Sequence, residues 1–158
     1  MKLTEKKMDL FELPTDYTLV HCISLDCAMG AGIAKVFNKK FPKMKLRLVD
    51  CIRGNKLTHP ISILYGVERT VEDKLILIDE PQAVINMITK EKYWHKPTYD
   101  DFQAALIHAA FLCKKYGIKK LGMPRIGCGL DRLEWDEVEA MIENCFKDVD
   151  VEIIVCYK

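Results

Sequence analysis

A ten-residue stretch with three glycines, Gly122-Met-Pro-Arg-Ile-Gly-Cys-Gly-Leu-Asp131, restricts the fold of this chain more than any other segment. Glycine loses more conformational freedom on folding than other residues, so this density is typical of backbone that takes a positive φ or closely approaches a ligand. The preceding residues end a helix, turn at Gly117 and enter a strand, and a helical pattern follows directly after Asp131. The stretch is therefore predicted to be a strand-to-helix loop that offers N–H groups to an anion, or a tight turn in which Asp131 caps the next helix.

A second glycine-bearing loop, Ser24 to Gly32, also lies between a strand and a helix. The apolar run 17–23 before it is typical of a strand buried on both faces, and apolar residues recur at helical spacing from Ile33 to Phe41. Ligands of open α/β sheets bind beyond the carboxyl ends of strands, so both loops are candidates for one site. Neither loop matches the P-loop or dinucleotide pattern, and neither contains a lysine. The loops therefore favour a diphosphate that is held mainly by backbone.

The rest of the chain alternates between predicted strands and helices. Further strands are expected at residues 2–7, 61–65, 75–78, 83–88, 118–121 and 151–157, with 61–65 paired to 75–78 through 66–73. Further helices are expected over 43–51, from the capping pattern at Thr98 to Tyr116, and after Asp131, where Trp135 and Phe146 mark an inner face. The lysine-rich first strand suits an exposed sheet edge. The pattern predicts a single α/β domain over residues 1–158, with three layers around a central mixed sheet.

Composition excludes several classes of function. The formal net charge of +1 argues against nucleic-acid binding by bulk electrostatics, although a nucleic acid could still carry the substrate. The N-terminus has no apolar core of a secretory signal, and the longest apolar run, 104–113, is too short to span a membrane. The seven cysteines form no CxxC pair and no zinc-ligand spacing, so reduced thiols and no bound metal are expected. These features predict a soluble cytoplasmic monomer, or a nuclear one in a eukaryote.

Three segments of the chain carry a resemblance to a known protein family: residues 21–34 (His-Cys-Ile-Ser-Leu-Asp-Cys-Ala-Met-Gly-Ala-Gly-Ile-Ala), residues 95–99 (His-Lys-Pro-Thr-Tyr), and residues 124–135 (Pro-Arg-Ile-Gly-Cys-Gly-Leu-Asp-Arg-Leu-Glu-Trp). Together they resemble a macrodomain of the terminal ADP-ribose protein glycohydrolase class, the ALC-type macrodomains. The resemblance extends over nearly the whole chain and is weakest over residues 52–82. It implies a three-layer α/β/α macrodomain that binds ADP-ribose and requires no cofactor.

The resemblance also assigns roles to individual positions. Lys90 corresponds to the catalytic lysine of the class and Asp131 to its catalytic aspartate. Asp9 corresponds to the acidic residue that accepts a hydrogen bond from the adenine amino group, although Met8 replaces the usual glycine before it. The chain lacks the Asn-rich loop of other hydrolytic macrodomains, as does this class. The residues expected to bind ADP-ribose are Asp9, Leu10, Ser24, Met29, Gly30, Ala31, Gly32, Ile33, Pro124, Ile126, Gly127, Cys128, Gly129 and Leu130.

The implied reaction removes mono-ADP-ribose from glutamate or aspartate side chains and deacylates O-acyl-ADP-ribose, which has the same ester chemistry. The distal ribose can open to an aldehyde, a neutral lysine can form a Schiff base with it, and a carboxylate can assist proton transfer and release. Because free lysine has a pKa of ~10.4, Lys90 needs burial or a cationic neighbour, for which Lys92, Lys96 and Arg132 are candidates. The expected partners are ADP-ribose, mono-ADP-ribosylated proteins and O-acyl-ADP-ribose.

Several alternatives stay open at this point. Within the same fold, the substrate could be ADP-ribosylated DNA bases, as in DarG-like antitoxins, or ADP-ribose 1″-phosphate. The chain could also be a reader that binds ADP-ribose without chemistry, although a reader needs neither Lys90 nor Asp131. Asp9 could cap a first turn instead of binding adenine. His21 is interpreted as a core histidine, and Cys128 has no assigned base that would make it a nucleophile.

Overall fold

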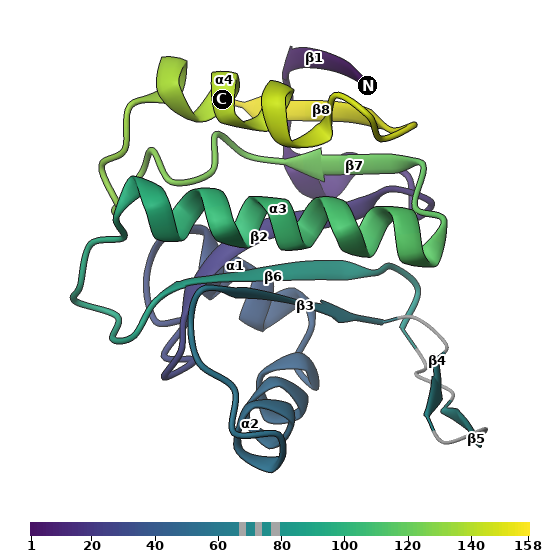
Figure 1. Cartoon of the computed structure of the whole chain (residues 1–158), viewed down its shortest axis with the longest axis vertical. Coiled ribbons are helices and arrows are strands. Elements are labelled where there is room, and N and C mark those ends of the chain that lie inside the picture. Colours follow the sequence, from purple (N-terminus) through teal and green to yellow (C-terminus); the bar gives the residue numbers. More distant parts are fainter. Residues whose placement is uncertain (67–68, 72–73, 77–79) are drawn as a thin grey trace.

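The computed structural model of the protein describes residues 1–66, 69–71, 74–76 and 80–158. Its main element is a mixed sheet with the strand order β1-β8-β7-β2-β6-β3 (Figure 1). Its strands are β1 (Lys2–Lys7), β2 (Thr18–Ser24), β3 (Ile61–Tyr65), β6 (Val84–Lys90), β7 (Lys120–Met123) and β8 (Glu152–Tyr157). Only β3 is antiparallel to its neighbour, β6, while the other pairs of this sheet are parallel. The predicted edge position of the lysine-rich first strand is confirmed.

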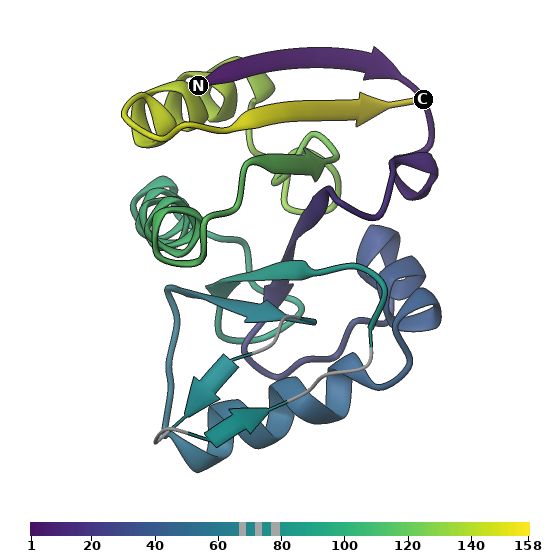
Figure 2. The ribbon, with the colours of Figure 1, turned by 90° about the vertical axis from the view of Figure 1, so that its right-hand side faces the viewer.

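Helices cover both faces of this sheet, which gives the predicted three layers. The helices are α1 (Gly32–Lys40), α2 (Met44–Gly54), α3 (Tyr99–Tyr116) and α4 (Trp135–Phe146). In Figure 2, the green α3 and yellow-green α4 lie on one side of the strands and the blue α1 lies on the other. Two separate apolar cores match this arrangement, because α3 and α4 contribute to one and α1 and α2 to the other. Among the described residues, no helix is both long enough and apolar enough to cross a membrane.

Local signals set the ends of α3 as predicted. The Thr98 hydroxyl accepts a hydrogen bond from the Asp101 amide at 3.1 Å, which satisfies a free N–H group of the first turn. At the other end, Gly117 takes the left-handed conformation at φ +65° and terminates the helix. The connection that leads from β6 into α3 therefore ends in a well-capped helix.

Two predictions about the fold are wrong. Strand 61–65 pairs with β6, which is buried along nearly its whole length, and not with the described part of the segment 75–78. The described part of that segment, β5 (Lys74–Ile76), pairs instead with β4 (Arg69–Val71), and residues 77 and 78 lie outside the described residues. The last helix does not start directly after Asp131 but at Trp135, with Glu134 before it, because the Asp131 carboxylate is bonded to Lys90.

The interpretation of His21 as a core histidine is confirmed. Its ring is fully buried, stacks on Phe37 at a centroid distance of 3.8 Å, and shares a 2.7 Å hydrogen bond with Asn86 of the neighbouring strand. Burial lowers the pKa of His21 from 6.5 to about 4, against the opposing effect of the Asn86 hydrogen bond. The folded protein therefore holds a neutral imidazole at pH values where the unfolded chain takes up a proton.

This shift predicts how stability depends on pH. The contribution of His21 is complete above its unfolded pKa of 6.5 and is lost as the pH falls towards about 4. Between pH 7.5 and pH 5 the loss should be roughly 2 kcal/mol. Urea unfolding at both pH values checks this, with His21→Gln as the control, since glutamine can still bond Asn86 but does not titrate. If the variant loses as much free energy of unfolding as the wild type over this interval, His21 is not the cause.

Candidate active site

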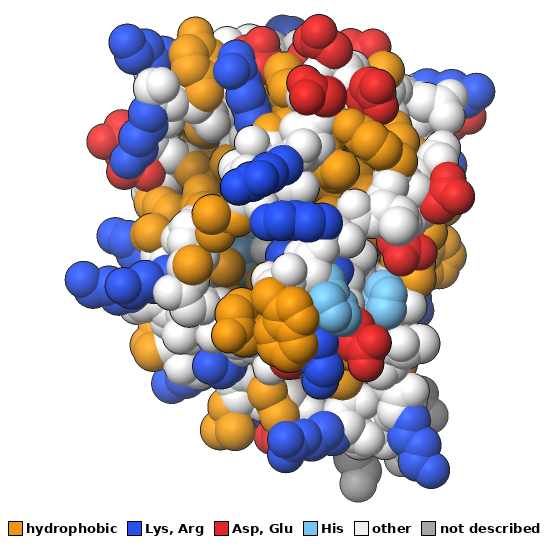
Figure 3. Space-filling view, turned by 90° about the vertical axis from the view of Figure 1, so that its left-hand side faces the viewer, with side chains coloured by type: hydrophobic (Ala, Val, Ile, Leu, Met, Phe, Trp, Pro, Cys, Tyr) orange, Lys and Arg blue, Asp and Glu red, His pale blue; other side chains and the backbone are white. Residues whose placement is uncertain are grey.

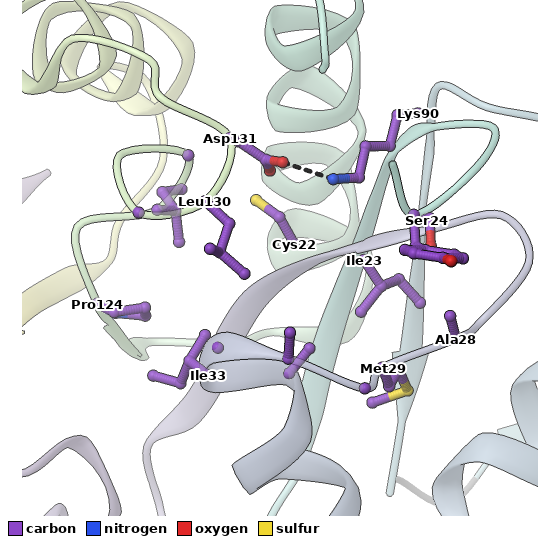
Figure 4. Close-up of a pocket in the computed structure, with 18 of the residues that line it drawn as sticks. Cys22, Ile23, Ser24, Ala28, Met29, Ile33, Lys90, Pro124, Leu130 and Asp131 are labelled. Atoms are coloured by element: carbon purple, nitrogen blue, oxygen red, sulfur yellow. Dashed lines mark hydrogen bonds and ion pairs between the residues drawn. The ribbon is translucent and has the colours of Figure 1, made fainter. Parts of the chain in front are cut away.

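A cavity of about 780 Å³ opens where β2, β6 and β7 end at their carboxyl sides (Figure 4). Three parts of the chain line it. The first is the end of β2 with the loop and helical turn that follow (residues 22–24 and 28–34), the second consists of Lys90, Tyr93 and Lys96, and the third is the loop after β7. The strand ends of a parallel sheet meet at the same edge, which explains why segments far apart in sequence converge here. The two glycine-bearing loops therefore line one cavity, as the order of strands and helices predicted.

The first loop is held in an unusual backbone conformation. Cys27 and Met29 take positive φ angles of 54° and 48°, which non-glycine residues adopt at a cost. Asp26 stabilises this path, since it accepts hydrogen bonds from the Ser24 hydroxyl and from the amide of Ala28 at 3.2 Å. Partial burial acts to raise the pKa of Asp26, but the hydrogen bonds that it accepts, the one from the Tyr93 amide included, lower it overall. The loop is thus built around a carboxylate that stays ionised.

Both loops offer unsatisfied N–H groups to the cavity. Helix α1 starts at Gly32, and its cap residue Ala31 gives no side-chain hydrogen bond, so the first turn of the helix exposes free donors. Among the described residues, the amides of Met29 and Gly30 in the first loop and of Gly129 and Leu130 in the second donate to no protein acceptor; these four residues also line the cavity. Free amides next to the positive end of a helix favour an anion, as the sequence predicted.

The second loop does not open a helix, which corrects part of that prediction. Between Gly127 and Leu133 it closes on itself through a 2.7 Å hydrogen bond from the Leu133 amide to the Gly127 carbonyl. Gly127 takes φ +77°, and a Cβ atom there would lie 2.9 Å from Phe102 and Leu133, so only glycine fits. The donors of this loop are therefore free turn amides, without the dipole of α4.

Lys90 and Asp131 form an ion pair in the cavity. The Lys90 Nζ atom lies 2.6 Å from Asp131 Oδ1, and each side chain is only 12% exposed (Figure 4). Lys90 is the last residue of β6, whereas Asp131 lies eight residues after the end of β7. Lys90 therefore stands at the end of an apolar strand, whereas Asp131 lies well inside the loop that follows β7. An ammonium and a carboxylate at this distance can exchange a proton with each other and with a bound molecule.

Most of the residues predicted to bind ligand line the cavity, and three do not. Asp9 and Leu10 lie outside the lining, as does Cys128. Asp9 accepts a 2.9 Å hydrogen bond from the Phe11 amide and caps the short 3₁₀ helix Leu10–Glu12, so the turn-capping alternative is confirmed. Its other carboxylate oxygen lies 3.8 Å from Lys158, and contact with adenine stays a prediction. Burial raises the pKa of Cys128 to about 11, which agrees with the view that it is no nucleophile.

The cavity also contains residues that the sequence did not single out as binding residues. These are Cys22, Ile23, Ala28, Ala34, Tyr93, Lys96 and Arg125. Of the three suggested cationic neighbours of Lys90, Lys96 lines the cavity while Lys92 and Arg132 do not. Arg125 is directed elsewhere, since its guanidinium bonds Glu5 at 3.2 Å and lies 4.8 Å from the Tyr157 ring. Tyr93 and Lys96 both lie within six residues of Lys90, and Lys96 also belongs to the segment 95–99 that carries the resemblance, so these signals could have identified them.

Cys22, which the sequence predicted only to be a reduced thiol, lies beside the ion pair (Figure 4). Burial raises the pKa of its thiol well above the usual range, and the nearby Asp131 carboxylate adds to this effect. The thiol therefore stays protonated at neutral pH, where it is a poor nucleophile. Lys90 is accordingly the better candidate for attack on a bound molecule.

Comparison with known proteins gives four findings. A family model described as the Macro domain matches residues 20–142. The human protein named ADP-ribose glycohydrolase OARD1 is 39% identical over 154 residues, which cover 98% of this chain and 90% of the human protein. The DNA ADP-ribosyl glycohydrolase of Mycobacterium tuberculosis is 27% identical over 151 residues, which cover 93% of this chain and 40% of that protein. The solved macrodomain of Mycobacterium tuberculosis DarG has the same fold, with a TM-score of 0.82 and 22% identity over 99% of this chain and 97% of that one.

Proposed function

Because this chain belongs to the Macro domain family, we propose that it is an ADP-ribosyl hydrolase that removes mono-ADP-ribose from glutamate and aspartate side chains. It should also deacylate O-acetyl-ADP-ribose, which carries the same type of ester on the distal ribose. The observation that carries this proposal is the 2.6 Å ion pair of Lys90 and Asp131 inside a cavity lined by free backbone amides. The 39% identity to a human protein named ADP-ribose glycohydrolase supports the same activity.

The two loops serve as the binding frame in this proposal. The amides of Met29 and Gly30, together with those of Gly129 and Leu130, would hold the diphosphate, and the first turn of α1 would add its free donors. A cavity of about 780 Å³ lies in the range of ligand sites that enclose most of a small molecule. The distal ribose would then lie at the end of the cavity that holds Lys90.

Lys90 would act as the nucleophile after it loses a proton. Its nitrogen bonds to C1″ of the distal ribose as the ester oxygen leaves with the bonding electrons, which releases the carboxylate of the target side chain. The proton of the attacking amine passes to Asp131. The C1″–O4″ bond of the adduct then breaks as the nitrogen lone pair forms a protonated Schiff base, and Asp131 gives its proton to O4″. Asp131 next takes a proton from water, whose hydroxide adds to C1″. The C–N bond breaks as the lysine nitrogen takes up a proton, and ADP-ribose is released.

Turnover of defined substrates tests this proposal. We expect the protein to bind ADP-ribose. We also expect it to release free ADP-ribose from a protein that carries mono-ADP-ribose on glutamate side chains, and from O-acetyl-ADP-ribose. ADP-ribose 1″-phosphate serves as the substrate of the phosphatase alternative and should stay intact. ADP-ribose binding by calorimetry without turnover of either ester would overturn the proposal and leave a reader module.

A second candidate, hydrolysis of ADP-ribosylated DNA, is favoured by one observation. Tyr93 and Trp94 follow Lys90 closely, are 61% and 62% exposed, and contact each other edge to face at 5.0 Å. Figure 3 shows a face of the molecule on which hydrophobic side chains lie beside histidines, with lysines, arginines and some acidic side chains around them. Exposed aromatic rings of this kind can stack on the bases of a single strand. The Mycobacterium tuberculosis relative is itself named a DNA ADP-ribosyl glycohydrolase.

Replacement of Trp94 by alanine distinguishes the two candidates. If a base stacks on this ring, kcat/KM for ADP-ribosylated single-stranded DNA should fall by about tenfold, since base stacking contributes ~1–3 kcal/mol. The same variant should hydrolyse O-acetyl-ADP-ribose at the wild-type rate, because that substrate has no base to stack. Phe111→Ala is the matched control, since Phe111 is 54% exposed on α3 and does not line the cavity. Equal effects of Trp94→Ala on both substrates would contradict a base-stacking role.

A further inference from the structure

The segment His95-Lys-Pro-Thr-Tyr99, which connects β6 to α3, has no role in the reaction as described above. Two of its side chains nevertheless reach the loop that contains Asp131. The Lys96 Nζ atom donates a hydrogen bond to the Leu130 carbonyl, one residue before Asp131. The Tyr99 hydroxyl accepts a 3.0 Å hydrogen bond from the Glu134 amide, three residues after Asp131. The two contacts therefore hold the backbone on both sides of the aspartate.

The backbone held in this way is in a disfavoured conformation. Arg132, directly after Asp131, takes φ +60° although it is not glycine. Its amide bonds the Gly129 carbonyl at 3.2 Å, and the Leu133 amide bonds the Gly127 carbonyl at 2.7 Å. Such a conformation persists where the surroundings restrain it. The contacts of Lys96 and Tyr99 supply that restraint from outside the loop.

Leu130 adds a third restraint across the cavity. A Cβ atom on Gly32 would lie only 3.1 Å from the Leu130 Cδ1 atom, so the leucine side chain rests against the start of α1. Leu130 is otherwise 59% exposed, and little apolar packing holds it in place. The Lys96 contact fixes the backbone of this residue, and with it the distance between the two loops.

The reaction itself makes this restraint necessary. Among the described residues, the side chain of Asp131 has one protein partner, the Lys90 ammonium. Once the Lys90 nitrogen is bonded to the ribose, it is no longer an ammonium with three free hydrogens. The ion pair that holds Asp131 in the resting protein is then lost or weakened, just when the carboxylate has to act on water. Something other than Lys90 must hold Asp131 at that step.

We propose that Lys96 and Tyr99 are positioning residues that keep the Asp131 carboxylate at the reacting carbon while Lys90 is covalently occupied. This inference rests on the proposed function, because it assigns a role within the lysine-dependent reaction. It predicts that the second half of the reaction, release of the Lys90 adduct, is the step that suffers when either contact is removed. Binding of ADP-ribose should be affected little, since the two contacts are made to the backbone of the protein and not to the ligand.

Two variants test the contacts separately. Lys96→Met removes the donor and keeps the chain length, and Tyr99→Phe removes the hydroxyl oxygen only. We expect kcat for O-acetyl-ADP-ribose to fall by about tenfold in the first and about threefold in the second, with KM and the Kd for ADP-ribose within about twofold of wild type. Lys96→Arg should restore most of the activity, because a guanidinium can also donate to a carbonyl. Lys92→Met is the matched control, since Lys92 is on the same connection and does not line the cavity.

A direct contact of Lys96 with the ligand is the competing explanation, because Lys96 lines the cavity. Tyr99 separates the two explanations, since it does not line the cavity and yet bonds the same loop. A weaker Kd for ADP-ribose in Lys96→Met, with kcat unchanged and with Tyr99→Phe like wild type, would overturn the proposal. Reduction with cyanoborohydride gives a further readout, because slower release should increase the fraction of protein trapped as the Lys90 adduct.

Hydrogen exchange tests the restraint without any turnover. The amides of Arg132, Leu133 and Glu134 are hydrogen-bonded within or to this loop, and we expect them to exchange about tenfold faster in Lys96→Met and in Tyr99→Phe. Unchanged exchange in both variants overturns the proposal, whatever their activity. If the wild type hydrolyses no ester, the proposed function fails, and this measurement still decides whether the two side chains hold the loop. If the wild type is active and the variants match it in kcat and in exchange, only the positioning role fails.

Discussion

Lys90→Arg is expected to abolish turnover of O-acetyl-ADP-ribose, with kcat at least about a thousandfold below the wild-type value. Arginine keeps the positive charge and can still pair with Asp131, but its guanidinium stays protonated and is not a nucleophile. The Kd for ADP-ribose should stay within about fivefold, because backbone amides supply most of the binding frame. Steady-state kinetics and calorimetry on the same preparation measure both quantities.

This substitution separates two roles that a simple truncation would mix. Lys90→Met also removes the nucleophile, but it leaves the Asp131 carboxylate without its 2.6 Å partner in a site where it is only 12% exposed. Loss of one member of such a pair should destabilise the fold by about 2 kcal/mol or more, which a lower Tm would reveal. Lys90→Arg should therefore be inactive and stable, and Lys90→Met inactive and less stable. If Lys90→Arg keeps a tenth or more of the activity, lysine is not the nucleophile, and its charge alone matters.

The parts of the fold that follow from short-range signals were predictable from the sequence. The apolar run of β2 indicated a strand buried on both faces, a strand was expected at the position of β6, and Thr98 and Gly117 marked the two ends of α3. The pairing of β3 with β6 was not predictable in this way, because strand pairing is set by packing between distant segments and not by local pattern. The late start of α4 was missed for a related reason, since the Asp131 side chain that could cap it is engaged by Lys90, 41 residues earlier.

The candidate site, too, could be predicted from the sequence only in part. The two glycine-bearing loops and their meeting point followed from the order of strands and helices, and the roles proposed for Lys90 and Asp131 come from the resemblance to a known family. Cys22 was not recognised, because it and His21 are consecutive residues of a strand whose two faces are both buried. Successive side chains of a strand point to opposite faces, so His21 packs on Phe37 of α1 while Cys22 faces the cavity. Only the position of the strand within the folded sheet distinguishes these two environments.

Asp131→Asn should lower kcat for O-acetyl-ADP-ribose by about a hundredfold or more and, unlike Lys90→Arg, should let the lysine adduct accumulate. Asparagine keeps the shape of the side chain and an oxygen that can accept a hydrogen bond from Lys90, but it cannot take a proton from water. Attack by Lys90 requires only a neutral amine, which solvent can also generate, whereas release of the adduct requires a base at the reacting carbon. The second step should therefore be slowed more than the first.

Mass spectrometry of the intact protein after reduction with cyanoborohydride distinguishes these steps. We expect a larger fraction of Asp131→Asn than of the wild type to carry the mass of a reduced ADP-ribose adduct on Lys90, and no adduct in the double variant with Lys90→Arg. Loss of both turnover and adduct in Asp131→Asn would instead assign the aspartate to the first step, as the group that deprotonates lysine. The trapped intermediate therefore gives the order in which Lys90 and Asp131 act from their 2.6 Å contact in the resting protein. The positioning role of Lys96 and Tyr99 depends on the same order, since it is needed only if Asp131 acts after Lys90 has left the pair.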